Sequence, residues 1–126
     1  MINTQDLALA VAGVIGSAVA LVHGVLTQRL IVRPLEVVAA PKLPRSIRQL
    51  AAMLLHFSTF NWFIGGLALI VAALTAGHEV KLAVGLLVGS SYLYGAIGNL
   101  IATRGRHPGW MLYAIALALI AYALYR

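Results

Sequence analysis

The chain has 126 residues, of which 62% are hydrophobic and only 10% are charged. A soluble domain carries roughly 25% charged residues, so this composition excludes an ordinary soluble globule, and the high hydrophobicity excludes a disordered chain. The absence of cysteine excludes disulfides, iron–sulfur clusters and thiolate zinc sites. The length allows one domain, and we expect residues 1–126 to form a single integral membrane domain.

Four apolar stretches are candidates for helices that cross a bilayer, which takes about 20 residues each. They cover approximately residues 7–31, 47–75, 82–103 and 108–125. None shows the alternation of a membrane strand, and unpaired strand edges are not tolerated in lipid. The sequence therefore predicts an all-α fold, a four-transmembrane-helix antiparallel bundle with short loops between its last three helices.

Residues typical of helix ends frame these stretches. Asn3 or Thr4 can cap the first helix, and Ser46 with Gln49 has the spacing of a capping box at the second. Pro108 suits the first turn of the fourth helix. Two glycines fit the left-handed position that ends the second and third helices, Gly77 and Gly105.

The basic residues are distributed unequally between the two ends of the predicted bundle. One end has Arg29, Arg33, Lys42, Arg45, Arg48, Arg104 and Arg106 with one acid, Glu36; the other has Lys81, Arg126, Asp6 and Glu79. The positive-inside rule places the more basic end in the cytoplasm, so the N- and C-termini are expected outside. Trp110 and Tyr113 then mark the cytoplasmic interface, and Tyr122 and Tyr125 the outer interface.

The net charge of +6 does not predict a nucleic-acid partner, because the basic residues flank helices instead of lining a groove. Two interpretations remain: they set orientation only, or they also bind anionic lipid head groups, at about 1 kcal/mol each. The candidates for head-group contact are Arg29, Arg33, Lys42, Arg45, Arg48, Arg104 and Arg106.

Stripes of small residues indicate where the helices pack, because close contact between helices in lipid needs small side chains. The first helix has Ala12, Gly16, Ala20 and Gly24 at a spacing of four; the third has Gly85 and Gly89, continued by Tyr92, Ala96, Asn99 and Thr103; the fourth has Ala114, Ala118 and Ala121. These stripes predict a compact bundle, and they are equally compatible with a homodimer.

Polar residues within spans are costly and are usually functional or paired. Here they are expected to gather in the cytoplasmic half, in a pocket of His23, His56, Thr59, Asn61, Asn99 and His107. Neutral imidazole is a common metal ligand, so His23 and His56 are candidate ligands of a metal ion or a haem. The alternative is structural: the histidines hydrogen-bond to neighbouring helices, at about 0.6 kcal/mol per bond.

Three segments together resemble short bacterial inner-membrane proteins with four spans and no assigned activity: residues 23–29, residues 56–58 with Trp62, and residues 104–110. The resemblance implies a multi-pass protein of the bacterial inner membrane, and it transfers no reaction, cofactor or catalytic residue.

Two classes of function follow from the residues. One is a protein whose cytoplasmic-half pocket binds a metal, haem, quinone or lipid. The other is an accessory or assembly subunit in a larger membrane complex, or a small homodimeric transporter, with structural histidines. An enzyme is less favoured, because the sequence shows neither a nucleophile–base–acid set nor a pair of carboxylates.

Overall fold

The computed structural model describes residues 3–125, and in this range the chain is helical without strands. The elements are α1 (Thr4–Thr27), a π-helical turn η1 (Gln28–Val32), α2 (Arg33–Ala39), α3 (Arg45–Thr75), α4 (His78–Thr103) and α5 (Gly109–Leu124). The predicted all-α class is confirmed. Of the predicted charges, Arg126 lies outside the described residues.

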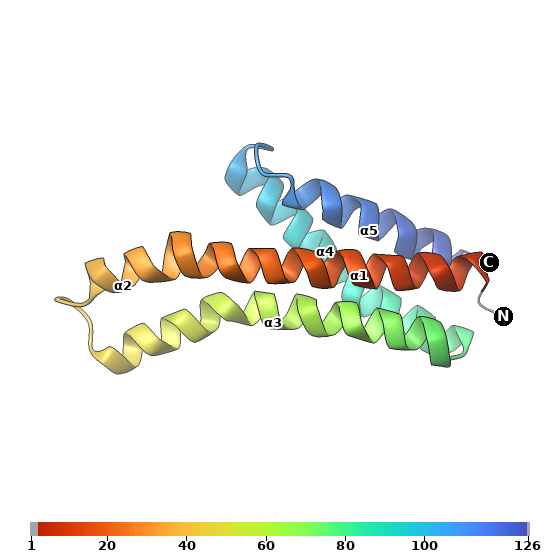
Figure 1. The fold of residues 1–126 in the computed structure, drawn as a ribbon, viewed down its shortest axis with the longest axis horizontal. Helices are drawn as coiled ribbons and strands as arrows, with labels where there is room; N and C mark the ends of the chain where they lie inside the picture. The colour runs from red at the N-terminus through yellow and green to blue at the C-terminus, as the bar shows by residue number, and fades with distance from the viewer. Residues whose placement is uncertain (1–2, 126) are drawn as a thin grey trace.

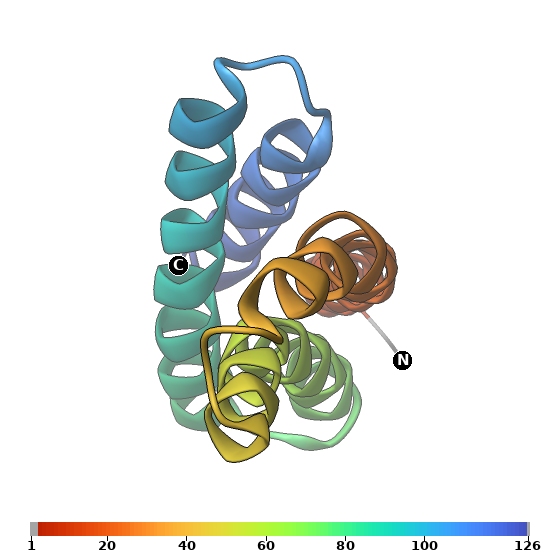
Figure 2. The same ribbon diagram turned by 90° about the vertical axis from the view of Figure 1, so that its left-hand side faces the viewer.

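The helices form a ring in which each contacts its neighbours in sequence. α1 packs against α3 and α5, and α4 packs against the same two helices. Figure 1 shows that α3 runs antiparallel to α1 and that α5 returns antiparallel to α4, so both ends of the chain lie at one end of the molecule. The hairpin of α2 and the start of α3 projects beyond the other helices at the opposite end (Figures 1 and 2).

Three segments are long and apolar enough to cross a membrane: Thr4–Ala39, Arg45–Thr75 and His78–Thr103. The first has 36 residues, about 54 Å at 1.5 Å per residue, against roughly 30 Å for a hydrocarbon core. α5 has 16 residues and is about 24 Å long. The structure therefore indicates a membrane protein with three helices of spanning length and one shorter apolar helix.

The distribution of side chains is the reverse of that in a soluble bundle. Small residues of α1 are fully covered, and Ala12 and Ala20 are both 0% exposed. Large aliphatic residues face outward instead, with Leu87 73% and Ile101 71% exposed. Water would not support so much exposed apolar surface, whereas lipid would.

Glycines allow the helices to approach closely, as the stripe on the first helix predicts. A Cβ atom at Gly16 would overlap the Tyr92 hydroxyl, and one at Gly24 would lie 2.7 Å from Cγ2 of Thr59. The stripe predicted on α5 does not pack within the chain, because Ala114, Ala118 and Ala121 are exposed; its use in a homodimer stays a prediction. The buried face of α5 consists of Tyr113, Ala116 and Ile120. α5 is apolar on all sides, so polarity in its sequence does not distinguish its faces.

Two of the predicted helix ends are confirmed. The Asn3 side chain caps α1 by accepting a 2.7 Å hydrogen bond from the Asp6 N–H. Gly105 is left-handed with φ 74°, as is Arg104 before it with φ 50°.

Other predicted ends are wrong. α3 begins at Arg45 after Pro44 without a side-chain cap, so Ser46 and Gln49 form no capping box. Gly77 has an extended backbone and precedes α4. It therefore links two helices across a very short connection and does not end α3 in a left-handed turn. Pro108 stands one residue before α5 instead of inside its first turn.

The first predicted span ends at residue 31, but the helix continues to Ala39. The Arg33 N–H bonds to the carbonyl of Gln28, five residues earlier, in the π-helical turn η1. Pro34 follows directly and has no N–H to donate. The wider π turn carries the helix into this proline without ending it. The other spans differ less from prediction: α3 begins at Arg45, α4 begins at His78, and α5 covers Gly109–Leu124.

Polar contacts join the helices at the end where the termini lie. Asp6 of α1 and Lys81 of α4 form an ion pair of 2.5 Å, with side chains 17% and 18% exposed. Gln5 donates to the carbonyl of Tyr125 at 2.6 Å, and the Tyr122 hydroxyl donates to that of Thr4 at 3.4 Å. The start of α1 is thereby fixed to both α4 and α5.

The Asp6–Lys81 pair gives a testable prediction. The variants D6N and K81M each leave one charge of a largely covered pair without its partner. We expect each to lower the free energy of unfolding by about 1–3 kcal/mol, between the values for exposed and buried pairs. The double variant should lose less than the sum of the two. Unfolding in mixed micelles, followed by circular dichroism, measures this, and strictly additive losses would show that the pair contributes nothing.

Candidate functional site

Four aromatic rings, one each from α1, α3, α4 and α5, meet inside the bundle. His23 lies edge-on to Trp62 with ring centroids 4.8 Å apart, and Trp62 lies edge-on to Tyr113 at 5.1 Å. Tyr113 and Tyr92 are 4.9 Å apart. We call His23, Trp62, Tyr92 and Tyr113 the aromatic junction. Tyr113 is 0% exposed, so its ring packs inside the bundle.

A cavity of about 120 Å³ lies beside the aromatic junction and brings together three of the predicted pocket residues, His23, Asn99 and His107. They come from α1, from α4 and from the loop before α5. Tyr113 and Leu112 of α5 also line this cavity, as does Val22 of α1. We call it the junction pocket. It is almost entirely apolar apart from these few polar groups, and Val22 is 57% exposed, so its rim reaches the outer surface.

A hydrogen bond fixes the proton position on one histidine of the junction pocket. The backbone N–H of Gly109 donates to Nδ1 of His107 at 3.0 Å, so the neutral ring carries its proton on Nε2 and offers a donor there. Nε2 of His23 lies 3.3 Å from the Ser58 hydroxyl and 3.2 Å from the Thr27 hydroxyl, and either tautomer of His23 satisfies these contacts.

The remaining polar groups of the junction pocket are also donors. The Asn99 amide uses one N–H on the carbonyl of Gly95 at 3.0 Å, which leaves a second N–H. The Tyr113 hydroxyl is buried and has no hydrogen-bond partner among residues 3–125. A buried hydroxyl without a partner costs about 1–3 kcal/mol, so an acceptor beside this group would be favourable.

The other three predicted pocket residues lie elsewhere. Nε2 of His56 is 2.8 Å from Oε1 of Gln28, across the α1–α3 contact. Thr59 packs against Gly24 of α1. Asn61 donates to the Ser91 hydroxyl on α4 at 2.8 Å. These residues connect α3 to its two neighbours and do not line the junction pocket.

The two histidines predicted as metal ligands are engaged with different partners. Nε2 of His23 lies near two hydroxyls, of Ser58 and of Thr27, and His56 bonds to an amide oxygen. Within the described range, no group of three or more histidines and acids is placed to hold a metal ion. A metal ion held by His23 and His56 stays a prediction.

Sequence reasoning missed the contributions of Gln28 and Tyr113. Gln28 stands at the end of the charge-free part of the first span, and the π turn that begins there has no simple sequence signal. Counting residues from the basic ends does not reveal its pairing, because Gln28 directly precedes Arg29 whereas His56 lies eight residues after Arg48. Tyr113 lies in a helix that is apolar on all sides, where only packing shows which ring points inward.

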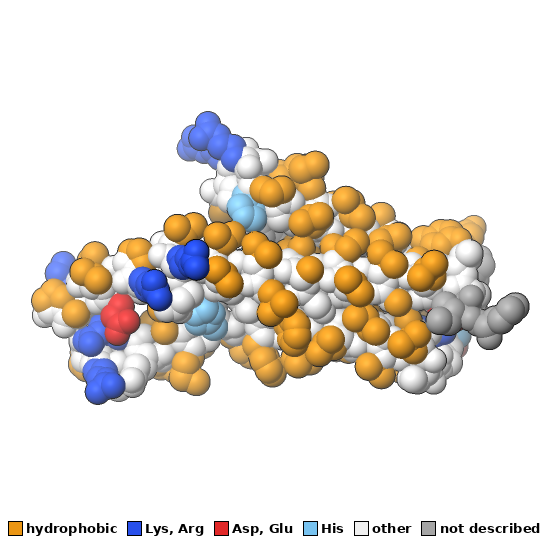
Figure 3. All heavy atoms as spheres, in the orientation of Figure 1, with side chains coloured by type: hydrophobic (Ala, Val, Ile, Leu, Met, Phe, Trp, Pro, Cys, Tyr) orange, Lys and Arg blue, Asp and Glu red, His pale blue; other side chains and the backbone are white. Residues whose placement is uncertain are grey.

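The predicted head-group residues lie at the end opposite the termini. Figure 3 shows basic side chains gathered over the projecting hairpin and over the loop at the end of α4, while apolar side chains cover the middle of this face. Five of these residues are exposed: Arg29, Arg33, Arg45, Arg104 and Arg106. The backbone of Arg104 is left-handed. Arg48 is half-buried.

Comparisons with protein-family models, with curated proteins and with solved structures found no match to this chain. The junction pocket is therefore interpreted from its own geometry and chemistry.

The Gln28–His56 contact generates a prediction on stability. Substituting Gln28→Ala and His56→Ala, singly and together, forms a double-mutant cycle across the α1–α3 contact. We expect a coupling energy of about 0.6–1.7 kcal/mol, the range of hydrogen bonds between membrane helices. Unfolding in mixed micelles measures it, with Asn61→Ala in place of His56→Ala as the uncoupled control. A coupling indistinguishable from that control would contradict the hydrogen bond.

Proposed function

We propose that the chain is a four-span protein of the bacterial inner membrane with its N- and C-termini outside. α5 is shorter than the other spans, but it is apolar throughout and packs antiparallel to α4. The basic residues gather at the end opposite the termini (Figure 3), which is the cytoplasmic end by the positive-inside rule. The resemblance of three sequence segments to short four-span inner-membrane proteins supports the choice of membrane.

Topology is testable because the chain has no cysteine. We expect a single cysteine introduced as Thr4→Cys to react with a membrane-impermeant maleimide on intact spheroplasts. Lys42→Cys and Arg106→Cys should react only after the membrane is permeabilised. Labelling of Lys42→Cys in intact spheroplasts, with Thr4→Cys protected, would reverse the orientation. Labelling of Tyr125→Cys, which follows α5, only after permeabilisation, as for Arg106→Cys, would remove the fourth span.

We further propose that the junction pocket binds the carbonyl-bearing head of an amphiphile dissolved in the membrane, and that a quinone fits best. The observation that carries this is the buried Tyr113 hydroxyl, which has no partner within the described chain. With the second Asn99 N–H and Nε2–H of His107, it makes a set of neutral donors suited to a carbonyl oxygen. No charged side chain lines the pocket, which disfavours an ionic ligand.

The size of the junction pocket supports a ligand that enters only in part. At about 120 Å³ it is below the roughly 300 Å³ of a typical enclosed small-molecule site, so it is too small for a haem. A single ring or head group fits, and an attached apolar chain can leave past Val22 and Leu112, which are 57% and 41% exposed. The aromatic rings of the junction provide one wall.

A second class of function, an accessory subunit or a homodimer with structural histidines, is favoured by one observation. The small residues Ala114, Ala118 and Ala121 of α5 lie on an exposed face, where small residues promote helix association. In that case the residues around the junction pocket would serve only to pack the helices together.

Tyr113→Phe separates the two classes. The variant keeps the ring and removes the unpartnered hydroxyl, so we expect the free energy of unfolding to stay equal or to rise. We expect the affinity for decylubiquinone to fall about 5–10-fold, the effect of one hydrogen bond. Quenching of tryptophan fluorescence in detergent reports binding, because Trp62 contacts Tyr113. Tyr122→Phe, which removes an exposed hydroxyl at the other end of the molecule, is the matched control.

The outcomes are distinct. A second measurement compares how much diester and diether phospholipid the purified protein retains. If decylubiquinone does not quench the tryptophan fluorescence of the wild type, and the two lipids are retained equally, a carbonyl site is contradicted. Retention of diester but not diether lipid would assign the site to a phospholipid ester. A large loss of stability in Tyr113→Phe would show that the hydroxyl serves the fold.

A further inference from the structure

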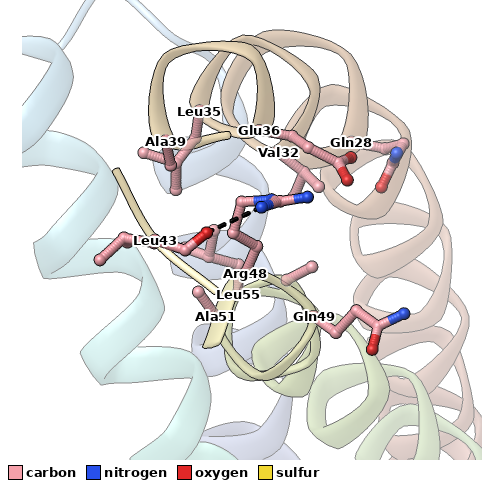
Figure 4. A pocket seen from close by; sticks show the side chains of 11 residues that line it. Gln28, Val32, Leu35, Glu36, Ala39, Leu43, Arg48, Gln49, Ala51 and Leu55 are labelled. Carbon is pink, nitrogen blue, oxygen red and sulfur yellow. Dashed lines mark hydrogen bonds between the residues drawn. The ribbon is translucent and has the colours of Figure 1, made fainter. Parts of the chain in front are cut away.

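A second cavity lies at the far end of the molecule, within the projecting hairpin. Its volume is about 230 Å³, and it separates η1 and α2 from the start of α3. Figure 4 shows Glu36 and Gln28 on one side of this cavity and Arg48 and Gln49 on the other. Val32, Ala39 and Leu55 supply apolar walls. We call it the hairpin cavity, and it is separate from the junction pocket.

The guanidinium of Arg48 is held by hydrogen bonds from one nitrogen, while another nitrogen has no partner in the described chain. Nη1 donates to the carbonyl of Leu43 at 2.8 Å, drawn as the dashed line in Figure 4, and to that of Ala40 at 3.5 Å. Nε is buried and has no hydrogen-bond partner among the residues described. A guanidinium favours phosphate and carboxylate oxygens, which accept from two of its N–H groups at once. Arg48 therefore lines the cavity as a fixed cation, and its Nε–H is enclosed and unpaired within residues 3–125.

An acid stands across the hairpin cavity from this cation. Glu36 of α2 lines it together with Arg48, yet these two side chains form no ion pair with each other. Both charged side chains therefore line the same cavity without forming an ion pair. A ligand with a negative and a positive group would satisfy both, whereas a purely anionic ligand would meet repulsion from Glu36.

The surface around the hairpin cavity places it in the head-group layer. Apolar side chains on its outer face are strongly exposed, with Val37 at 75% and Val38 at 64%. Basic residues adjoin them, among them Arg33 and Arg45. Apolar and basic side chains side by side are typical of segments that lie in a membrane interface, where anionic lipid also attracts basic groups.

From this geometry we infer that the hairpin cavity binds the head group of a zwitterionic phospholipid with a primary ammonium, of the phosphatidylethanolamine type. The phosphate is placed against Arg48 and the ammonium against Glu36, whose carboxylate accepts its N–H groups. The acyl chains extend along the apolar walls and the exposed face of the hairpin. A quaternary ammonium has no N–H to donate, so choline lipids fit less well. The inference does not depend on the ligand of the junction pocket.

Retention of added phospholipids by the detergent-purified full chain, read by native mass spectrometry, tests this. The probes are dioleoyl phosphatidylethanolamine, phosphatidylcholine and phosphatidylglycerol. We expect the wild type to retain the ethanolamine lipid about tenfold over either of the others. E36Q should lose the preference over choline, and R48Q should lose retention of the ethanolamine lipid. Glu36 is exposed, so E36Q leaves the fold intact.

Matched controls carry the same changes in charge at other positions. E79Q removes an acid at the opposite end of the molecule, and R45Q removes an exposed arginine close to Arg48; both should retain the wild-type preference. Equal retention of all three lipids by the wild type would overturn the proposal. So would a preference for the glycerol lipid that R45Q and R48Q weaken alike, because it would reflect basic charge alone. A preference for ethanolamine unchanged in E36Q would also contradict it.

Discussion

The contact on which the structure depends is the meeting of four aromatic rings, one from each of the packed helices. Lipid tails are as apolar as leucine, so apolar burial does not drive helices together within a bilayer. Close fit must do so instead. Two rings of the junction lie against glycines of a neighbouring helix: Tyr92 against Gly16, and Trp62 against Gly95, where a Cβ would come within 2.7 Å of the ring. An aromatic ring on one helix therefore packs against a glycine on the neighbouring helix.

This fit also determines where polar groups meet. Tyr92 is buried and its hydroxyl donates to the carbonyl of Trp62 at 3.3 Å, which ties α4 to α3. Tyr113 then lies between Trp62 and Tyr92, and its own hydroxyl is left without a partner in the described chain. Tyr113 lines the junction pocket. The site that we propose for a neutral acceptor thus follows from the way the helices interlock.

The two cavities differ in chemistry and lie at different levels along the first helical segment. The junction pocket lies among charge-free spans, and its polar groups are neutral. The hairpin cavity lies where α1 and α2 run past the length needed to cross a hydrocarbon core, and it contains Arg48 and Glu36. The π turn that begins at Gln28 lies between the two cavities. The Gln28 side chain contacts His56, and the helix continues through Pro34 after the turn.

Much of the fold follows from the sequence, because a charge-free run of sufficient length has few alternatives in lipid. The stripe of Ala12, Gly16 and Ala20 also correctly predicts the buried face of α1. Within the site, His23, Asn99 and His107 line one cavity as predicted, whereas His56, predicted at the same depth, does not.

What the sequence does not predict depends on rotation about a helix axis. α5 has no polar side to orient it, so the buried positions of Tyr113 and Ile120 depend on packing that no pattern within α5 records. His56 and Asn61 lie on faces of α3 that turn toward α1 and α4 respectively, away from the junction pocket. The extended helix beyond residue 31 was not foreseeable, because a proline usually ends a helix and here a π turn precedes it.

The most direct test of the aromatic junction compares two glycines of the bundle. A Cβ at Gly16 overlaps the Tyr92 hydroxyl, whereas one at Gly98 meets nothing within 4 Å. Unfolding in mixed micelles should show Gly16→Ala less stable than the wild type by about 1–3 kcal/mol, the cost of overpacking. Gly98→Ala should be as stable as the wild type or more so, because alanine is the better helix former. Equal stability of the two variants would contradict the interlocked junction.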